Sequence, residues 1–232
     1  MTVIEPQMVQ VPAGTLAMGI PKFEGEFFED LRPWHTGKIV EMAAFSISKF
    51  AITNPEYRDF VEKTGADVPM KLDDPEFNAD NQPVVGISWL DSVAYCKWLQ
   101  EATGKAYHLP TDAQYEYAAR GGSEGTRYPW GDELDPSRAS YGSRTAPEPV
   151  DQYPPNGYGV YDMVGGLWEW CQDLYVDVSE GQQPSNGPNP ADNPVLRGSS
   201  YLNSDPKSLY IAYRHEDPRD LRHPIVGFRV VI

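Results

Sequence analysis

The chain has few cysteines, few basic residues and no long apolar run, and each shortage argues against a class of protein. Two cysteines, Cys96 and Cys171, cannot build a disulfide framework, so each is expected to be a buried thiol. A net charge of −15, from 19 Lys and Arg against 34 Asp and Glu, argues against a nucleic acid or an anionic membrane as partner. No run reaches membrane-spanning length and the N-terminus lacks signal-peptide features, so the cytoplasm is the default location.

Glycine, proline and aromatic residues are plentiful instead. The chain has 20 Gly, 22 Pro and 12% aromatic residues, which predicts a loop-rich fold held together by packed rings. A charged fraction of 23% and a mean hydropathy of −0.52 indicate a folded globule rather than a disordered chain. No break in composition divides the sequence, so residues 1–232 are expected to form a single domain.

The local patterns predict a mixed α+β fold with short strands and a few helices. Alternating apolar residues predict strands at 8–19 and 39–52 and a final strand pair at 195–202 and 226–232. Pro, Gly, Asn and charged residues predict loops between them. The predicted loops are 20–38, 66–82 and 177–194, and the stretch 123–160 is predicted to consist of turns and short strands.

Three helices are predicted from their capping residues. Asn54 is expected to cap the first, followed by Pro55 at its first position. Ser88 and Thr111 are expected to cap the second and third, because each has a capping-box partner three residues later. Glycines at 65, 104 and 121 are expected to end the three helices.

The stretch PPNGYGVYDMVGGLWEWC, residues 154–171, combines turn-forming glycines with large rings and predicts an irregular core loop. Asp162 and Glu169 are its carboxylates. An extended backbone would turn the carbonyls of Gly165 and Leu167 toward the same side as Glu169. This set could hold a hard cation. The alternative is that Glu169 accepts hydrogen bonds from loop amides while Asp162 caps a turn.

The run NGYGVYDMVGGLWEW resembles the signature NxxGLYDMxGNxWEW of the formylglycine-generating-enzyme-like family. Other runs resemble the same family in the same order along nearly the whole chain. They are VPAGTLAMG (11–19), ITNPEYRDF (52–60), PVVGISWLDSVAYCKWL (83–99), LPTDAQYEYAARGG (109–122), YPWGDE (128–133), VLRGSSY (195–201) and GFRVV (227–231). The resemblance implies an α+β C-type-lectin-like fold, with a C-terminal ligand-binding segment at 197–230.

The resemblance also implies which chemistry to expect. In the family, residues matching Asp162, Gly165, Leu167 and Glu169 bind Ca²⁺, while the stretch 140–151 that would supply a second calcium site is shortened here. Formylglycine-generating enzymes use two cysteines, five residues apart, to bind copper. Their positions are Asn203 and Ser208 here, so neither copper binding nor formylglycine synthesis is expected. The chain also lacks the helical domain with an iron triad that ergothioneine-pathway relatives carry.

Between the strands RGSS and GFRVV, rings, hydroxyls and short polar groups predict a ligand-binding surface on loops, as in an antibody paratope. This segment also resembles the variable region of diversity-generating-retroelement proteins. Their randomised asparagine codons cannot yield Lys, Glu, Gln, Met or Trp, and here only Lys207 and Glu216 are of these types. The candidate ligand-binding residues are Tyr201, Leu202, Asn203, Ser204, Asp205, Tyr210, Tyr213, His215, Asp217, Asp220 and His223.

Two function classes follow. The first is a non-catalytic protein that binds a protein or small ligand at its C-terminal loops, as a retroelement variable protein does, with a virion or surface location if phage-encoded. The alternative is a cysteine-free tailoring oxidoreductase acting on a peptide natural product, with Tyr201, Tyr213, His215 or Asp217 in its cleft. An accessory subunit is a third option. The first hypothesis predicts that replacing Tyr201, Tyr213 and His215 together leaves the melting temperature nearly unchanged.

Overall fold

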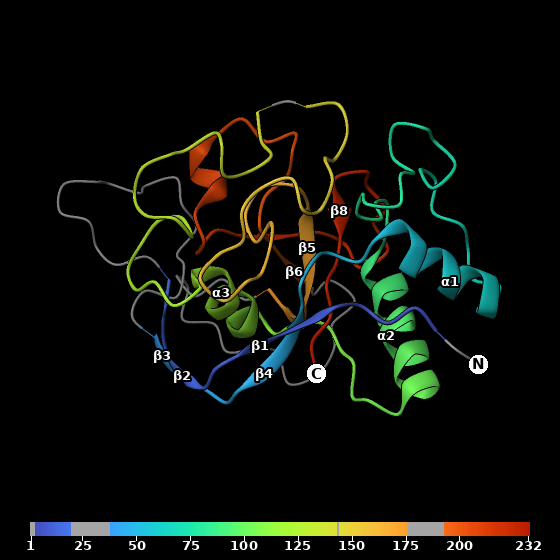
Figure 1. Ribbon diagram of the computed structural model, residues 1–232, viewed down its shortest axis with the longest axis horizontal. Coiled ribbons are helices and arrows are strands. Elements are labelled where there is room, and N and C mark those ends of the chain that lie inside the picture. The colour runs from blue at the N-terminus through green and yellow to red at the C-terminus, as the bar shows by residue number, and fades with distance from the viewer. Residues whose placement is uncertain (1–2, 20–37, 143, 176–192) are drawn as a thin grey trace.

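The computed structural model describes residues 3–19, 38–142, 144–175 and 193–232. The loops predicted at 20–38 and 177–194 therefore lie outside the described residues, except at their last positions. The architecture is α+β with short strands and few helices, as predicted (Figure 1). The elements in chain order are β1 (Met8–Val11), β2 (Gly14–Met18), β3 (Lys38–Met42), β4 (Phe45–Ser48), α1 (Asn54–Thr64), α2 (Trp89–Thr103), α3 (Asp112–Arg120), β5 (Trp168–Leu174), β6 (Pro194–Arg197), the 3₁₀ helix η2 (Pro206–Leu209), β7 (Arg214–Glu216) and β8 (Val226–Gly227).

The described strands form three sheets. β1 pairs with β4 and β2 pairs with β3, each in antiparallel register. The central sheet has the order β7-β6-β5-β8, in which β8 runs parallel to β5 and the other neighbours are antiparallel. The predicted final strand pair is therefore wrong in its pairing, because β5 lies between β6 and β8.

The centre of the sheet comes from the stretch predicted to be an irregular loop. Trp168–Leu174 is a strand, and its first four residues are all buried. Successive side chains of a strand point to opposite faces, so Trp170 packs with the core on the side of α1 and α2, whereas Cys171 packs with the core beside α3. Because both faces are covered, the first four residues are all buried, including the charged Glu169 between two tryptophans.

The helix ends follow the capping predictions closely. Ser88 and Thr111 accept hydrogen bonds from the backbone N–H groups of Asp91 and Gln114, each at 3.1 Å. Gly65, Gly104 and Gly121 end the three helices in the left-handed conformation.

The cap of α1 is corrected by one residue. It is Thr53, whose N–H donates to Glu56 Oε2 at 2.7 Å. Asn54 is buried, and its amide donates to the carbonyls of Phe77 and Ala79 at 2.8 Å.

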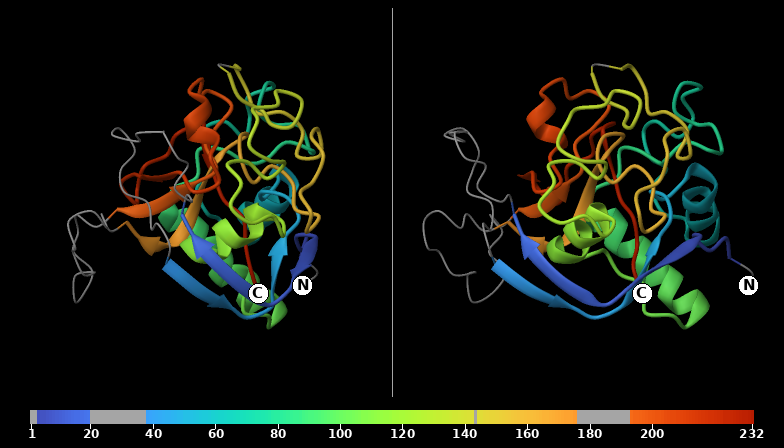
Figure 2. Two further views of the ribbon diagram at one scale, coloured as in Figure 1. Left: turned by 90° about the vertical axis from the view of Figure 1, so that its left-hand side faces the viewer. Right: turned by 60° about the vertical axis from the view of Figure 1, so that its left-hand side comes forward.

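The long irregular segments gather at one end of the molecule. The loop stretch after α3 and the C-terminal stretch that contains η2 rise together at the top of Figure 1, while β1, β4 and the chain ends lie at the bottom. The turned views in Figure 2 show the same division. One end of the molecule is therefore made of loops, and β1 and β4 lie at the other end.

None of the helices in the described residues is both long and apolar enough to cross a membrane.

Candidate ligand and metal sites

The two positions that match the family's catalytic thiols are used by the C-terminal loop itself. Asn203 Oδ1 accepts hydrogen bonds from Ser200 N at 3.1 Å and from Ser200 Oγ at 2.6 Å, which closes a turn. Ser208 is buried, and its Oγ lies 2.8 Å from Ser199 Oγ and donates to the carbonyl of Asp205 at 2.7 Å. Both side chains therefore hold the loop in shape.

Two of the predicted ligand-binding tyrosines are in the core, which corrects the expectation that they are displayed. Tyr201 is 1% exposed, and its hydroxyl donates to the carbonyl of Pro224 at 3.2 Å. Tyr210 is 8% exposed and packs edge-on against Tyr128, with ring centroids 5.4 Å apart. The burial of Tyr201 predicts instead that replacing Tyr201, Tyr213 and His215 together lowers the melting temperature.

The other candidates lie at or near the surface. Tyr213 and His215 both pack against Trp168, with ring centroids 5.7 and 5.3 Å from the indole. His215 Nε2 lies 3.5 Å from Asp217 Oδ2, so the two could share a proton when the histidine is protonated. The exposed candidates are Leu202, Ser204, Asp205, Asp220 and His223, and the partly exposed ones are Asn203, Tyr213, His215 and Asp217.

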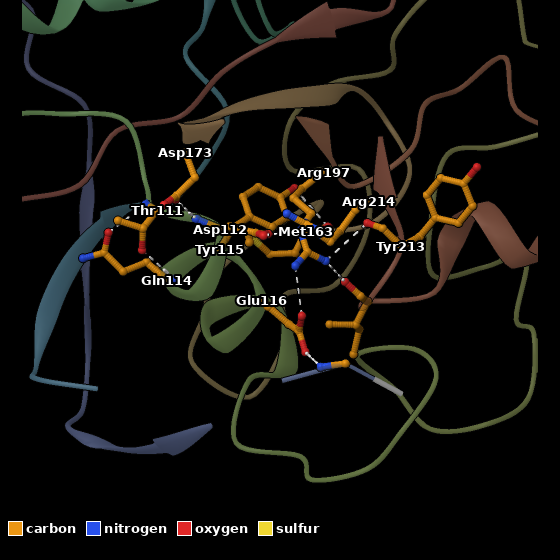
Figure 3. Close-up of polar contacts among 12 residues, drawn as sticks. Thr111, Asp112, Gln114, Tyr115, Glu116, Met163, Asp173, Arg197, Tyr213 and Arg214 are labelled. Atoms are coloured by element: carbon orange, nitrogen blue, oxygen red, sulfur yellow. Dashed lines mark hydrogen bonds and ion pairs between the residues drawn. The ribbon is translucent and has the colours of Figure 1, made fainter. Parts of the chain in front are cut away.

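A buried charge network that the sequence reasoning missed anchors this segment (Figure 3). Arg197 is fully buried; its Nε lies 2.5 Å from Asp112 Oδ1 and its Nη2 3.0 Å from Glu116 Oε2. Its Nη1 donates to the carbonyls of Ile211 and Tyr213 at 3.0 and 3.3 Å. Burial alone would lower the pKa of Arg197, but the two carboxylates raise it above its usual value. The guanidinium therefore stays charged and holds the backbone of the C-terminal segment.

Further groups complete this network. Arg214 Nε lies 2.8 Å from Asp112 Oδ2, and the Arg214 guanidinium sits over the ring of Tyr175. Arg120 pairs with Glu116 Oε1 at 2.6 Å. Asp112 and Glu116 follow the Thr111 cap, and acidic residues near the N-terminus of a helix are also favoured by the helix dipole. Their position in the sequence therefore did not distinguish that role from pairing with buried arginines.

Glu169 has a partner that the sequence analysis did not name. Its two carboxylate oxygens accept hydrogen bonds from Arg229, at 2.5 Å from Nε and 2.8 Å from Nη2. Both residues are essentially fully buried. Burial raises the pKa of Glu169, although Arg229 favours its ionised form. The partner of Glu169 is thus a guanidinium from GFRVV rather than a set of loop amides.

Asp162 is the unusual member of the predicted metal site. It has a positive φ of 48°, and its Oδ1 is buried with no hydrogen-bond partner among the described residues. Burial raises the pKa of Asp162 to about 8, although Arg229 acts in the opposite direction. The alternative in which Asp162 simply caps a turn leaves this oxygen unexplained, because a buried polar atom without a partner is costly.

The residues present fit a hard cation. Asp162, Leu167 and Glu169 line one cavity of about 20 Å³, enough for a single water-sized sphere. Oxygen is the donor that Ca²⁺ prefers. Gly165 is not among the lining residues; its φ is 80°, and a Cβ there would come within 2.6 Å of the Ser140 carbonyl oxygen. A side chain at 165 is therefore excluded where this loop meets Ser140.

The two cysteines are buried free thiols, as predicted. Burial raises the pKa of Cys96 to about 12 and that of Cys171 well above its usual value. A thiol held in this protonated state is a poor nucleophile and a poor metal ligand.

Comparison with known proteins identifies the family of this chain. The family model for the sulfatase-modifying factor enzyme 1-like domain matches residues 2–232. The formylglycine-generating enzyme of Streptomyces coelicolor is 31% identical over 283 residues, covering 95% of this chain and 87% of the relative.

Solved structures agree on the fold. PvdO from Pseudomonas aeruginosa superposes with a TM-score of 0.79 at 26% identity, covering 97% of this chain and 94% of PvdO. Treponema denticola variable protein 1 superposes with a TM-score of 0.75 at 20% identity, again covering 97% and 94% of the two chains, which shows a shared fold. This chain belongs to the sulfatase-modifying factor enzyme 1-like family, the family of the formylglycine-generating enzymes.

Proposed function

We propose that this protein binds a ligand without turning it over, and that its binding surface is the exposed part of the C-terminal loops. The observation that carries the proposal is the use of Asn203 and Ser208. Their side chains complete hydrogen bonds within the loop at the positions where catalytic relatives are expected to carry thiols. The loop has thus replaced reactive groups with groups that fix its shape.

The surroundings of the loop support a display role. Arg197 donates a hydrogen bond to the backbone of the C-terminal segment, and the ring of Tyr201 is buried. Leu202, Ser204 and Asp205 are exposed in the stretch between Tyr201 and η2. A rigid backbone that carries exposed side chains reduces the entropy cost of binding. The same arrangement allows those side chains to change without loss of the fold, which suits a variable protein of a diversity-generating retroelement.

A library experiment tests this proposal without knowledge of the ligand. Positions 202, 204, 205, 220 and 223 are randomised together, and the melting temperatures of purified clones are measured. We expect the free energy of unfolding of most clones to differ from that of the parent by no more than about 0.5 kcal/mol for each substitution, because substitutions at exposed positions have effects of this size. A matched library at Tyr201, Tyr210 and Ser208 should mostly fail to fold. Broad unfolding in the first library contradicts the proposal.

The His215 and Asp217 pair favours the second candidate, a tailoring oxidoreductase acting on a peptide natural product. A histidine that lies 3.5 Å from a carboxylate and packs against the same indole as Tyr213 could act as a general base. Oxygen uptake and peptide mass would be followed with the purified protein and candidate peptides. Turnover that is abolished by His215→Gln would establish this function and overturn the non-catalytic one.

We also propose that Ca²⁺ binds in the cavity lined by Asp162, Leu167 and Glu169, as the family resemblance implies. Bound Ca²⁺ would supply the positive charge that lets the buried Asp162 ionise. Calcium titration by calorimetry tests the site directly, and Asp162→Asn should weaken binding strongly. An absence of binding heat and of any thermal shift with Ca²⁺ would contradict it.

A further inference from the structure

A second polar atom without a partner lies at the same cavity as Asp162. Ser140 is 2% exposed, and its Oγ has no hydrogen-bond partner among the described residues. Ser140 and Asp162 both line the cavity of about 20 Å³. Unpartnered buried polar atoms are uncommon, so two around one small cavity indicate a shared partner.

The charges around the cavity favour a cation as that partner. Glu148 and Glu169 also line the cavity, but each has an arginine: Arg144 Nη1 lies 3.2 Å from Glu148 Oε1, and Arg229 holds Glu169. Asp162 is the lining carboxylate for which the described residues provide no ion pair of its own. Carboxylate and hydroxyl oxygens are both donors for a hard divalent cation, which would match the charge of an ionised Asp162.

We propose that Ser140 Oγ is a ligand of the cation together with Asp162, so that the cation joins the segment Ala139–Gly142 to the stretch before β5. The proposal rests on the calcium site proposed above and adds a donor to the predicted set of Asp162, Gly165, Leu167 and Glu169. A serine hydroxyl is a neutral oxygen donor that suits a hard cation. The contact between Gly166 N and Ser140 O, 2.9 Å long, already holds the two segments together.

Both of these segments are hydrogen-bonded to the backbone of the C-terminal loop. Gly142 N donates to the carbonyl of Asn203 at 2.8 Å, and Arg144 N donates to the carbonyl of Tyr201 at 3.0 Å. Tyr201 N in turn donates to the carbonyl of Gly166 at 2.9 Å. A cation held by Ser140 and Asp162 therefore steadies both sides of the backbone that presents Leu202 and Ser204. Binding of a ligand at these loops and binding of the cation should strengthen each other.

Calorimetric titration of the full chain with CaCl₂ after chelator treatment tests the proposed ligand. Ser140→Ala should bind Ca²⁺ at least about tenfold more weakly than the parent, an effect of the size seen when metal sites lose supporting groups. Ser137→Ala is the matched control, because Ser137 is exposed in the same loop region and bonds to Asp135. It should bind as the parent does.

The outcomes separate this inference from the calcium site itself. If the parent binds Ca²⁺ and Ser140→Ala binds equally well, the role of Ser140 is overturned while the site stands. If the parent binds no Ca²⁺, both proposals fail.

Should Ser140→Ala not fold, amide hydrogen exchange of the parent decides. Ca²⁺ should slow exchange at Gly142 and Arg144 by about tenfold, the factor that accompanies about 1.4 kcal/mol of local stabilisation. Unchanged exchange at these amides when Ca²⁺ is bound would overturn the inference.

Discussion

Two buried arginine sites in the described part of the chain differ in how completely their charges are matched. Around Arg197, the carboxylates of Asp112 and Glu116 are shared with Arg214 and Arg120, so positive and negative groups alternate. Around Arg229, Glu169 accepts two hydrogen bonds and the carbonyls of Ser48 and Tyr161 accept two more. Asp162 lies next to a small cavity, and its Oδ1 has no hydrogen-bond partner among the described residues. The groups around Arg197 thus form a closed network, in which each carboxylate is paired with arginines. The site around Arg229 has room for another positive charge.

The largest expected effect is at the closed network. Arg197→Met should destabilise the protein by about 3–5 kcal/mol, because Asp112 and Glu116 each lose one of their two buried guanidinium partners. Urea denaturation followed by far-UV circular dichroism measures this. Triple replacement of Arg197, Asp112 and Glu116 by apolar residues of similar size should recover much of the loss. A cost below about 1 kcal/mol for Arg197→Met would show that the network is not charge-matched as described.

Calcium removal should have the next largest effect, and it acts on the open site. At a free Ca²⁺ concentration one hundred times its dissociation constant, binding adds about 2.7 kcal/mol of stability. Chelation should therefore lower the melting temperature of the parent and leave Asp162→Asn nearly unchanged. Equal shifts in both proteins would place the calcium elsewhere.

The pH dependence of Asp162 sharpens the same contrast in the absence of calcium. The folded protein keeps the Asp162 proton up to about pH 8, whereas the ordinary pKa is 3.8. The folded state therefore binds more protons between these values, and stability falls as the pH rises through them. Asp162→Asn removes this loss, so in chelator at pH 8 it should be more stable than the parent by about 1–3 kcal/mol. Urea titrations at pH 5 and pH 8 measure the difference, and an equal effect at both would contradict the assignment.

The smallest effect is expected at an arginine that makes similar contacts in the open. Arg222 pairs with Asp91 through two hydrogen bonds of 2.8 Å and is exposed. Arg222→Leu should cost no more than about 1 kcal/mol, because solvent screens the pair and the side chains lose entropy. The same urea titration measures it. A cost near that of Arg197→Met would mean that burial is not what separates the two arginines.

Local signals in the sequence predicted the parts of the fold that short-range contacts decide. Ser88 and Thr111 cap their helices with partners three residues away, and the glycines at 65, 104 and 121 end them in a conformation that other residues resist. The first cap was misplaced by one residue because Asn54 satisfies distant carbonyls rather than its own helix. No short-range pattern distinguishes these two uses of an asparagine.

The sequence predicted a set of candidate residues but not which of them are exposed. Leu202, Ser204, Asp205, Asp220 and His223 are at the surface, whereas Tyr201 and Tyr210 are core residues. A tyrosine in a polar loop looks the same in sequence whether its ring faces solvent or the interior. The side that it faces depends on Pro224 and Tyr128, which lie far from these tyrosines along the chain.

The sequence by itself determined the family, the caps of α2 and α3, the glycines that end all three helices and the buried state of the two thiols, because each depends on neighbouring residues or on an ordered set of motifs. Only the tertiary structure decided that Trp168–Leu174 is the central strand, that Arg197 and Arg229 neutralise buried carboxylates, and that Ser140 shares a cavity with Asp162. These features depend on residues brought together from distant parts of the chain. The cost of burying charge, which selects such partners, has no short-range signature.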